Sequence, residues 1–405
     1  MSEYQHYQFA VDTSLTDGQL AQIRALTTRA SLTRHSFVNT YGWGDFKGDP
    51  RLLVETHYDA HLYFANWGTR RLILRWPATA LSLDTARAYC AGDSAEAWES
   101  NGHVLLALES DPDDDTEDFN DLFGIDEDGF DEDGGRDEQW LPSIARARRQ
   151  VAEGDLRLLY LAWLLRAHNG ELDDDDLEPA VPPGLADLPE PLADLATFLR
   201  IDEDLIAAAA QHAPPPAPPP TLAAHRAWTA TLDPQEKDTV LAQLLHDGDP
   251  HLLSGLRRRF LESRPPGGPA PAPRTVAELL AAVPARKRLR IARQEQQAAE
   301  ERDRVVRQAL EAQDRRLADL RHDPEAAWHR VGELLSQRGT RHYPEIVRLL
   351  GDLAALADRD ATTGAFAERY ARFIAAHRTK KALLRDLRAG GPACTALIAL
   401  TPAAD

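Results

Sequence analysis

In the N-terminal part of the chain, apolar and polar side chains alternate over several short segments. A period of two is typical of a strand with one buried face. These segments are 4–11, 36–41, 61–65, 71–76 and 103–108. Between 4–11 and 36–41, Leu20, Ile23 and Leu26 recur at helical spacing. After 36–41, Pro50 marks the first turn of another short helix. The pattern predicts an α+β domain over residues 1–108, a small antiparallel sheet with helices.

Beyond residue 139 the apolar residues follow the helical period instead. The run "LLYLAWLL" at 158–165 is apolar all round, which is typical of a helix buried on every side. The segment 275–321 is rich in Arg, Glu, Gln and Ala and predicts a long helix or a helical hairpin. A weak heptad-like stripe on it predicts a coiled-coil arm that packs on one face. The stripe consists of Leu289, Ala292, Ala299, Val306, Leu310, Leu317 and Leu320.

Two segments of unusual composition divide these patterns. One is strongly acidic, and the other, "APPPAPPPT", is a stiff polyproline II spacer. The predicted order is an α+β domain at 1–108, an acidic linker at 109–138, a helical domain at 139–212, a proline-rich linker at 213–221 and a helical C-terminal domain at 222–391. The fold class is therefore an α+β N-terminal domain followed by all-α middle and C-terminal regions.

The net charge of −19 is concentrated in one place. Segment 109–138 has 16 acids and a single base, whereas 222–391 has 30 bases and 23 acids. So many like charges repel one another, which predicts a mobile, solvated linker. Interspersed apolar residues leave a second interpretation open, in which the segment docks as a linear motif or covers a basic groove; they are Phe119, Leu122, Phe123, Ile125 and Phe130. The charge alone therefore does not exclude nucleic acid as a partner.

The chain has two cysteines, Cys90 and Cys394, which excludes a disulfide framework and a zinc site of several cysteines. The N-terminus lacks the pattern of a signal peptide, and the most apolar run is too short to span a bilayer. We therefore expect a cytoplasmic protein with no membrane partner.

The segment "NTYGWGDFKGDP" at 39–50 contains the first candidate site, with Trp43, Asp45 and Lys47 among three glycines. Glycine-rich loops before a helix can hold anions, although this spacing matches neither a dinucleotide fingerprint nor a Walker A loop. The alternative is a structural loop with a packed Trp43 and a surface pair between Lys47 and Asp45.

The segment "NWGTRR" at 66–71 contains the second candidate site, formed by Asn66, Trp67, Arg70 and Arg71. A tryptophan beside two arginines could stack on a base or contact an acidic partner. The alternative is a hairpin tip with Trp67 folded back on the sheet. If both loops lie at the same edge of the sheet, they form one binding surface.

A basic cluster at 285–293 is the third candidate. It consists of Arg286, Lys287, Arg288, Arg290 and Arg293. On a helix these side chains could contact phosphates or an acidic partner, and the alternative is a solvated or acid-paired helix face.

The stretch 343–387, with "YPEIVRLLGDLAAL" and "FAERYARFIAAHRTKKALLRDL", resembles the helical tail of bacterial SWIM zinc-finger proteins. The zinc motif of that family, C-x-C followed by C-x-H, is absent, so its zinc binding and its role do not carry over. The N-terminal opening and "NWGTRRLILRWP" resemble uncharacterised bacterial proteins.

No H-E-x-x-H, G-x-S-x-G or Walker A motif occurs, and we assign no catalytic residue, metal or cofactor. The sequence predicts a non-enzymatic cytoplasmic scaffold that binds a protein partner. One alternative is a nucleic-acid-associated accessory protein with an acidic autoinhibitory linker. Another is an enzyme that acts on a phosphate-bearing ligand through the loop at 39–50. The oligomeric state stays open.

Overall fold

The structure is a computed structural model that describes residues 4–27, 29–111, 140–215, 219–246, 250–264, 272–337 and 339–390. Packing divides the chain into two compact units, unit 1 (1–290) and unit 2 (291–405). The acidic segment from 112 to 138 and Cys394 lie outside the described residues. The predictions made for them therefore stay predictions.

Unit 1 begins with a seven-stranded antiparallel sheet, which confirms the predicted class of the N-terminal region. The order across the sheet is β2-β3-β1-β4-β5-β7-β6. The strands are β1 (Gln5–Ala10), β2 (Ser31–Leu32), β3 (Ser36–Tyr41), β4 (Ala60–Ala65), β5 (Arg70–Pro77), β6 (Ala95–Ser100) and β7 (His103–Ser110).

Local signals explain where the first helices begin. In α1 (Asp17–Leu26), Thr16 and Gln19 form a capping box at the N-terminus. In α2 (Pro50–Thr56), the Asp49 side chain accepts from two backbone N–H groups, and proline occupies the first helical position. A third short helix, α3 (Leu83–Arg87), is capped by Ser82.

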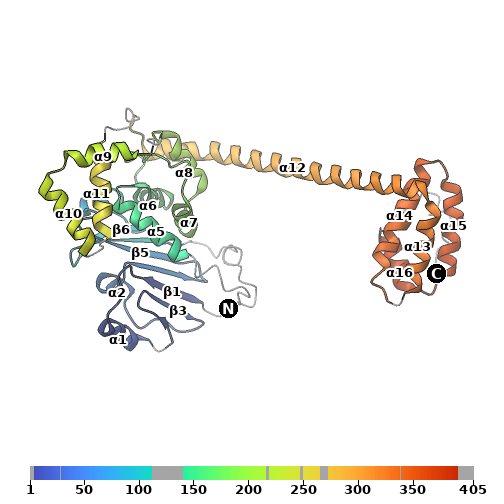
Figure 1. Ribbon diagram of the computed structural model, residues 1–405, viewed down its shortest axis with the longest axis horizontal. Helices are drawn as coiled ribbons and strands as arrows, with labels where there is room; N and C mark the ends of the chain where they lie inside the picture. Colours follow the sequence, from blue (N-terminus) through green and yellow to red (C-terminus); the bar gives the residue numbers. More distant parts are fainter. Residues whose placement is uncertain are drawn as a thin grey trace. The chain divides into compact units, whose positions relative to one another are not determined.

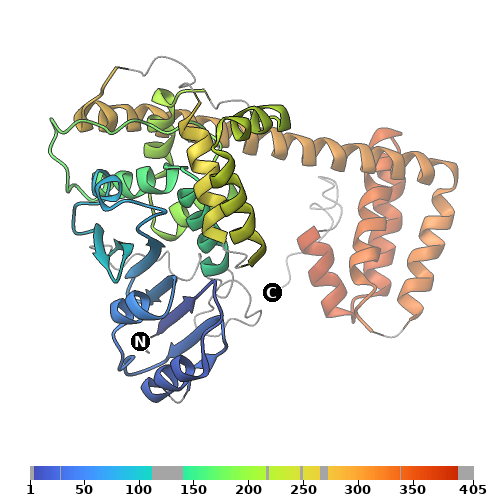
Figure 2. The ribbon, with the colours of Figure 1, turned by 60° about the vertical axis from the view of Figure 1, so that its left-hand side comes forward.

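Two hydrophobic clusters cover the two faces of the sheet. On one face, Phe9, Phe37 and Tyr63 pack with Ile23 of α1 and Val54 of α2. The other face is covered by helices of the middle region, which lie on the opposite side of the sheet from α1 and α2 (Figures 1 and 2). Burial on both faces explains why all six residues of β4, AHLYFA, are buried and mostly apolar.

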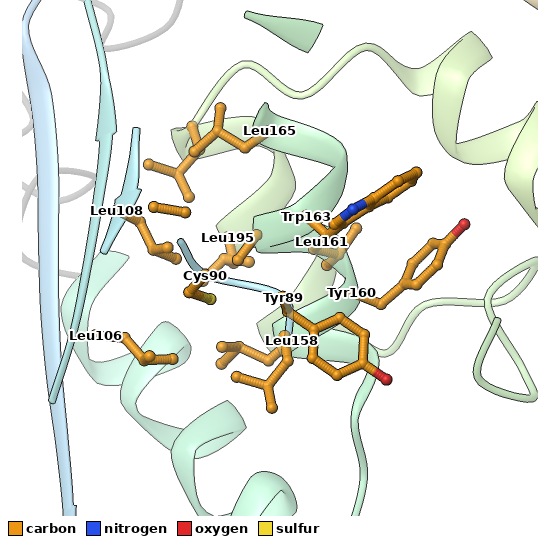
Figure 3. Close-up of a cluster of buried hydrophobic side chains, with 14 of the residues drawn as sticks. Tyr89, Cys90, Leu106, Leu108, Leu158, Tyr160, Leu161, Trp163, Leu165 and Leu195 are labelled. Carbon is orange, nitrogen blue, oxygen red and sulfur yellow. The ribbon is translucent and has the colours of Figure 1, made fainter. Parts of the chain in front are cut away.

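The helices of the middle region join the sheet in one core. They are α5 (Trp140–Ala152), α6 (Arg157–His168), α7 (Glu190–Phe198) and α8 (Glu203–Ala209), followed by a 3₁₀ turn at Ala210–His212. Figure 3 shows Cys90 between Leu106 and Leu108 of β7 and the leucines of α6. Burial of α6 on all sides agrees with its uninterrupted apolar sequence.

Three more helices of unit 1 follow the proline-rich spacer: α9 (Leu222–Thr231), α10 (Pro234–His246) and α11 (Pro250–Glu262). The long helix expected over 275–321 is α12 (Val276–His322), which begins in unit 1 and ends in unit 2. Val276 and Leu279 are buried in the core of unit 1. Every residue from 291 to 312 is exposed, so the heptad-like stripe has no packing partner there among the described residues.

Unit 2 is all helical, as predicted for the C-terminal region. Its helices are α13 (Pro324–Ser336), α14 (Tyr343–Arg359), α15 (Thr363–Ala376) and α16 (Lys381–Gly390). Aliphatic and aromatic residues such as Val331, Leu350, Phe366 and Leu383 form its core.

Candidate binding site at one end of the sheet

The topology brings the two candidate loops of the N-terminal region to the same end of the sheet. In the register of the antiparallel strands, Gln5 at the start of β1 lies opposite Tyr41 at the end of β3 and Ala65 at the end of β4. The loop 42–49 follows Tyr41, and the hairpin 66–69 follows Ala65. Both loops therefore leave the sheet at the end where β1 begins.

A row of polar and aromatic side chains crosses the sheet at this end. Neighbouring strands pair these residues directly, from β3 through β1, β4 and β5 to β7. The row is Asn39, Tyr7, Tyr63, Arg71 and Glu109. Directly opposed residues point to the same face, so the five side chains form one continuous strip.

Hydrogen bonds tie the loop 42–49 to this strip. The Tyr7 hydroxyl lies 2.6 Å from Oδ1 of Asp45 and 3.1 Å from Oε1 of Gln5. Its single proton goes to the closer carboxylate, and Tyr63 donates to the Gln5 oxygen over 3.1 Å. The Gln5 amide nitrogen in turn donates to the Gly44 carbonyl over 2.8 Å. The loop is therefore held at Gly44 and at Asp45.

Burial and the neighbouring carboxylate keep both phenols protonated. Loss of hydration, followed by the hydrogen bond to Asp45, raises the pKa of Tyr7 well above its usual value. Burial, assisted by the charge of Asp45, raises the pKa of Tyr63 to about 12. At neutral pH the two hydroxyls therefore act as hydrogen-bond donors.

At the other end of the strip, Arg71 and Glu109 form a bidentate ion pair. The guanidinium donates over 3.0 Å and 2.6 Å to the two carboxylate oxygens. Both side chains are partly exposed, at 41% and 33%. The pair adds a polar rim to the strip, and its charges are already matched.

The two loops at this end of the sheet each carry an exposed tryptophan. Trp43, in the loop 42–49, is 73% exposed, and the guanidinium of Arg29 lies 5.7 Å from its ring centroid. Trp67, in the hairpin 66–69, is 44% exposed. Lys47 is exposed and makes no hydrogen bond or ion pair within the described part of the chain. We call Trp43, Lys47, Trp67, Arg71 and Glu109 the sheet-end surface.

The structure does not bring Arg70 and Asn66 to this surface. Adjacent residues of a strand point to opposite faces, so Arg70 points away from the side of Arg71. It is buried among the middle helices and donates to the Phe198 carbonyl over 2.9 Å. The Asn66 side chain accepts from the Tyr4 backbone N–H over 3.0 Å and fixes the start of the hairpin.

The basic cluster of α12 is divided between paired and exposed side chains. Arg290 lies 2.9 Å from Asp204 and 3.0 Å from Glu203, both in α8. The Arg286 guanidinium lies against the side-chain amide of Gln211. Exposed side chains in the cluster are those of Lys287, Arg288 and Arg293.

Sequence reasoning missed Gln5, Tyr7, Tyr63 and Glu109. The alternation in "YQHYQ" and "HLYFA" places each tyrosine on one face of its own strand. Only the pairing of β1 with β4 shows that Tyr7 and Tyr63 lie on the same face of the sheet. That pairing joins segments far apart in sequence, and no local signal specifies it.

Other reactive side chains of unit 1 lie away from this surface. Burial raises the pKa of Cys90 to about 12, so its thiol stays protonated. It lines a cavity of about 430 Å³ beside β6, together with Arg87, Ala91, Gly92, Asp93, Glu96 and Ala97. Within the described ranges, no three His, Cys, Asp or Glu side chains come together in a way that would hold a metal ion.

The described helices include none that is both long enough and apolar enough to span a membrane. Comparison with known proteins assigns no family, since no protein-family model, curated protein or solved structure matches the chain.

Proposed function

We propose that this chain is a non-enzymatic cytoplasmic scaffold that binds a protein partner through the sheet-end surface. The observation that carries the proposal is the pair of exposed tryptophans, Trp43 and Trp67, on two loops at one end of the sheet. Tryptophan, with tyrosine and arginine, is enriched among the residues that dominate binding energy at protein interfaces.

The composition of the surface suits a protein partner. Aromatic groups supply contact area, and the Arg71–Glu109 pair and Lys47 supply a polar rim. A tryptophan at the centre of an interface typically costs about 2 kcal/mol or more when truncated, which corresponds to roughly a 30-fold loss of affinity.

The hydrogen bonds that hold the loop 42–49 also favour tight binding. Because Gly44 and Asp45 are bonded to Gln5 and Tyr7, the loop is ordered before a partner arrives. Ordering a loop during association costs free energy, so a preformed loop lowers that cost.

The test uses the full chain with a photo-crosslinking amino acid in place of Trp43 in one variant and of Trp67 in another. Leu245 of α10, which is 88% exposed, provides a matched control position. We expect one protein to be captured from native lysate at both tryptophan positions and not at the control position.

The captured protein is then purified and titrated calorimetrically against the unmodified chain. We expect the double variant W43A/W67A to bind it at least about 30-fold more weakly, whereas L245A binds as the parent does. Equal affinity of W43A/W67A and the parent for that protein would remove the sheet-end surface as the binding site.

A further inference from the structure

A segment rich in bases lies near the end of the described part of unit 2. Residues 372–388 include six bases and a single acid, Asp386, in a chain whose net charge is −19. The bases are Arg372, Arg378, Lys380, Lys381, Arg385 and Arg388. This local excess includes none of the residues of the α12 cluster or of the sheet-end surface.

Helix α16 arranges three of these bases on one face. Lys381, Arg385 and Arg388 are spaced at i, i+4 and i+7, which places them in one row along the helix. Leu383 and Leu387 lie on the opposite side and are buried in the core of unit 2. Because the leucines fix the rotation of the helix, the basic row faces solvent, and all three bases are exposed.

Elsewhere in unit 2, arginines pair with acids on neighbouring helices. Arg316 lies 2.9 Å from Asp352, and Arg359 lies 2.7 Å from Asp314. On α16, the acid next in sequence lies 3.3 Å from Arg385, whose side chain stays 80% exposed. Lys381 and Arg388 have no acidic partner in the part of unit 2 that the structure describes.

The first turn of α16 also runs against the usual charge preference of helices. Acidic side chains are favoured at a helix N-terminus, whereas α16 starts with Lys381 and has no acid in its first turn. A departure of this kind, with no compensating contact for Lys381 among the described residues, is typical of a functional surface.

The chemistry of the surface distinguishes between classes of partner. Protein interfaces are enriched in aromatic residues and arginine and depleted of lysine, and the fully buried centre of such an interface is depleted of charged residues. No large apolar side chain is exposed within the described residues from 311 to 390. Nucleic-acid backbones are contacted chiefly by Arg and Lys, and such contacts need no apolar centre.

We propose that the basic face of α16 binds the phosphate backbone of double-stranded nucleic acid. The contacts are to phosphates alone, so the binding is independent of base sequence. This activity goes beyond the protein scaffold proposed above, and it uses none of the sheet-end surface.

The experiment measures fluorescence anisotropy of a labelled 20-base-pair DNA duplex with the full chain between 50 and 200 mM salt. We expect binding that weakens as salt rises. The variant K381Q/R385Q/R388Q removes three charges and keeps good helix formers. It should lower the salt slope by about 2.7, so that the drop in affinity over this salt range becomes about 40-fold smaller.

Two further variants keep the result interpretable. K381R/R385K/R388K retains every charge and should bind as the parent does, which separates loss of charge from loss of fold. K287Q/R288Q/R293Q removes three exposed bases of the α12 cluster and should also bind as the parent does.

Three results would overturn the proposal. The first is that the full chain does not bind the duplex at 50 mM salt. The second is that the variant K381Q/R385Q/R388Q binds as well as the parent. The third is that polyglutamate displaces the labelled duplex as effectively as unlabelled DNA at equal charge concentration. That result would indicate that the surface binds acidic proteins instead.

Discussion

Unit 1 and unit 2 place their polar side chains differently. The sheet of unit 1 encloses His6, His61 and Arg70, with exposures of 3%, 0% and 2%. The core of unit 2 is built from aliphatic and aromatic residues, and most of its ion pairs lie at the surface. Buried ionisable groups respond to pH, whereas exposed charges respond to salt. The comparison therefore predicts that acid weakens unit 1 more than unit 2.

The largest expected effect is the loss of stability of unit 1 at acidic pH. Burial lowers the pKa of His6 to about 4 and that of His61 to about 3, from 6.5 in the unfolded chain. Above pH 6.5 both states are neutral and the full stability is present. As the pH falls, only the unfolded chain takes up protons, which costs about 2 kcal/mol per histidine at pH 5.

The measurement is hydrogen exchange of peptides from β4 and α14 at pH 5 and pH 7.5, corrected for intrinsic exchange. Protection of β4 should fall by about 4 kcal/mol in opening free energy. The variant H61F should halve this loss, whereas H329F, at a side chain of unit 2 that is 84% exposed, should leave it unchanged. Equal protection of β4 at the two pH values would contradict the attribution of acid sensitivity to the buried histidines of unit 1.

The next effect compares the two faces of β5. Replacing Arg70 by Ala removes the donor to the Phe198 carbonyl and opens a cavity, which should destabilise unit 1 by about 3 kcal/mol. Replacing Arg71 by Ala removes a partly exposed ion pair and should change stability by less than about 1 kcal/mol. Urea unfolding of both variants measures the difference, and similar losses would remove the distinction between a structural and a surface arginine.

Much of the sheet was predictable because five of its strands, β1, β3, β4, β5 and β7, carry a local signal, whereas β2 and β6 were not predicted. The segment 36–41 coincides with β3, and the turn at Asn101–Gly102 has positive φ at both residues, 52° and 72°. Strand β6 was missed because "AEAWES" has little β-propensity. It forms because that turn folds it back onto β7.

The two basic segments show what composition alone leaves undetermined. Residues 286–293 and 372–388 each hold five more bases than acids. The acids of α8, distant in sequence, neutralise Arg290, whereas Lys381 and Arg388 have no such neighbour among the described residues. The same dependence on distant residues applies at the end of the sheet. The sequence predicted the loops 42–49 and 66–69 separately, but only the strand pairing shows that they leave the sheet at the same end.

The smallest effect tests whether the Tyr7 hydroxyl orders the loop of Trp43. The variant Y7F removes the donor to Asp45 and keeps the buried ring, which should destabilise the loop by about 1 kcal/mol. Hydrogen exchange of a peptide covering 42–49 should become about five-fold faster. The matched variant Y63F removes a hydroxyl that donates to Gln5 and reaches the loop only through the Gln5–Gly44 bond, so exchange there should rise less than in Y7F. If Y7F left the exchange of this peptide unchanged, the Tyr7–Asp45 hydrogen bond would not order the loop, and only the bond from Gln5 to Gly44 would remain to order it before binding.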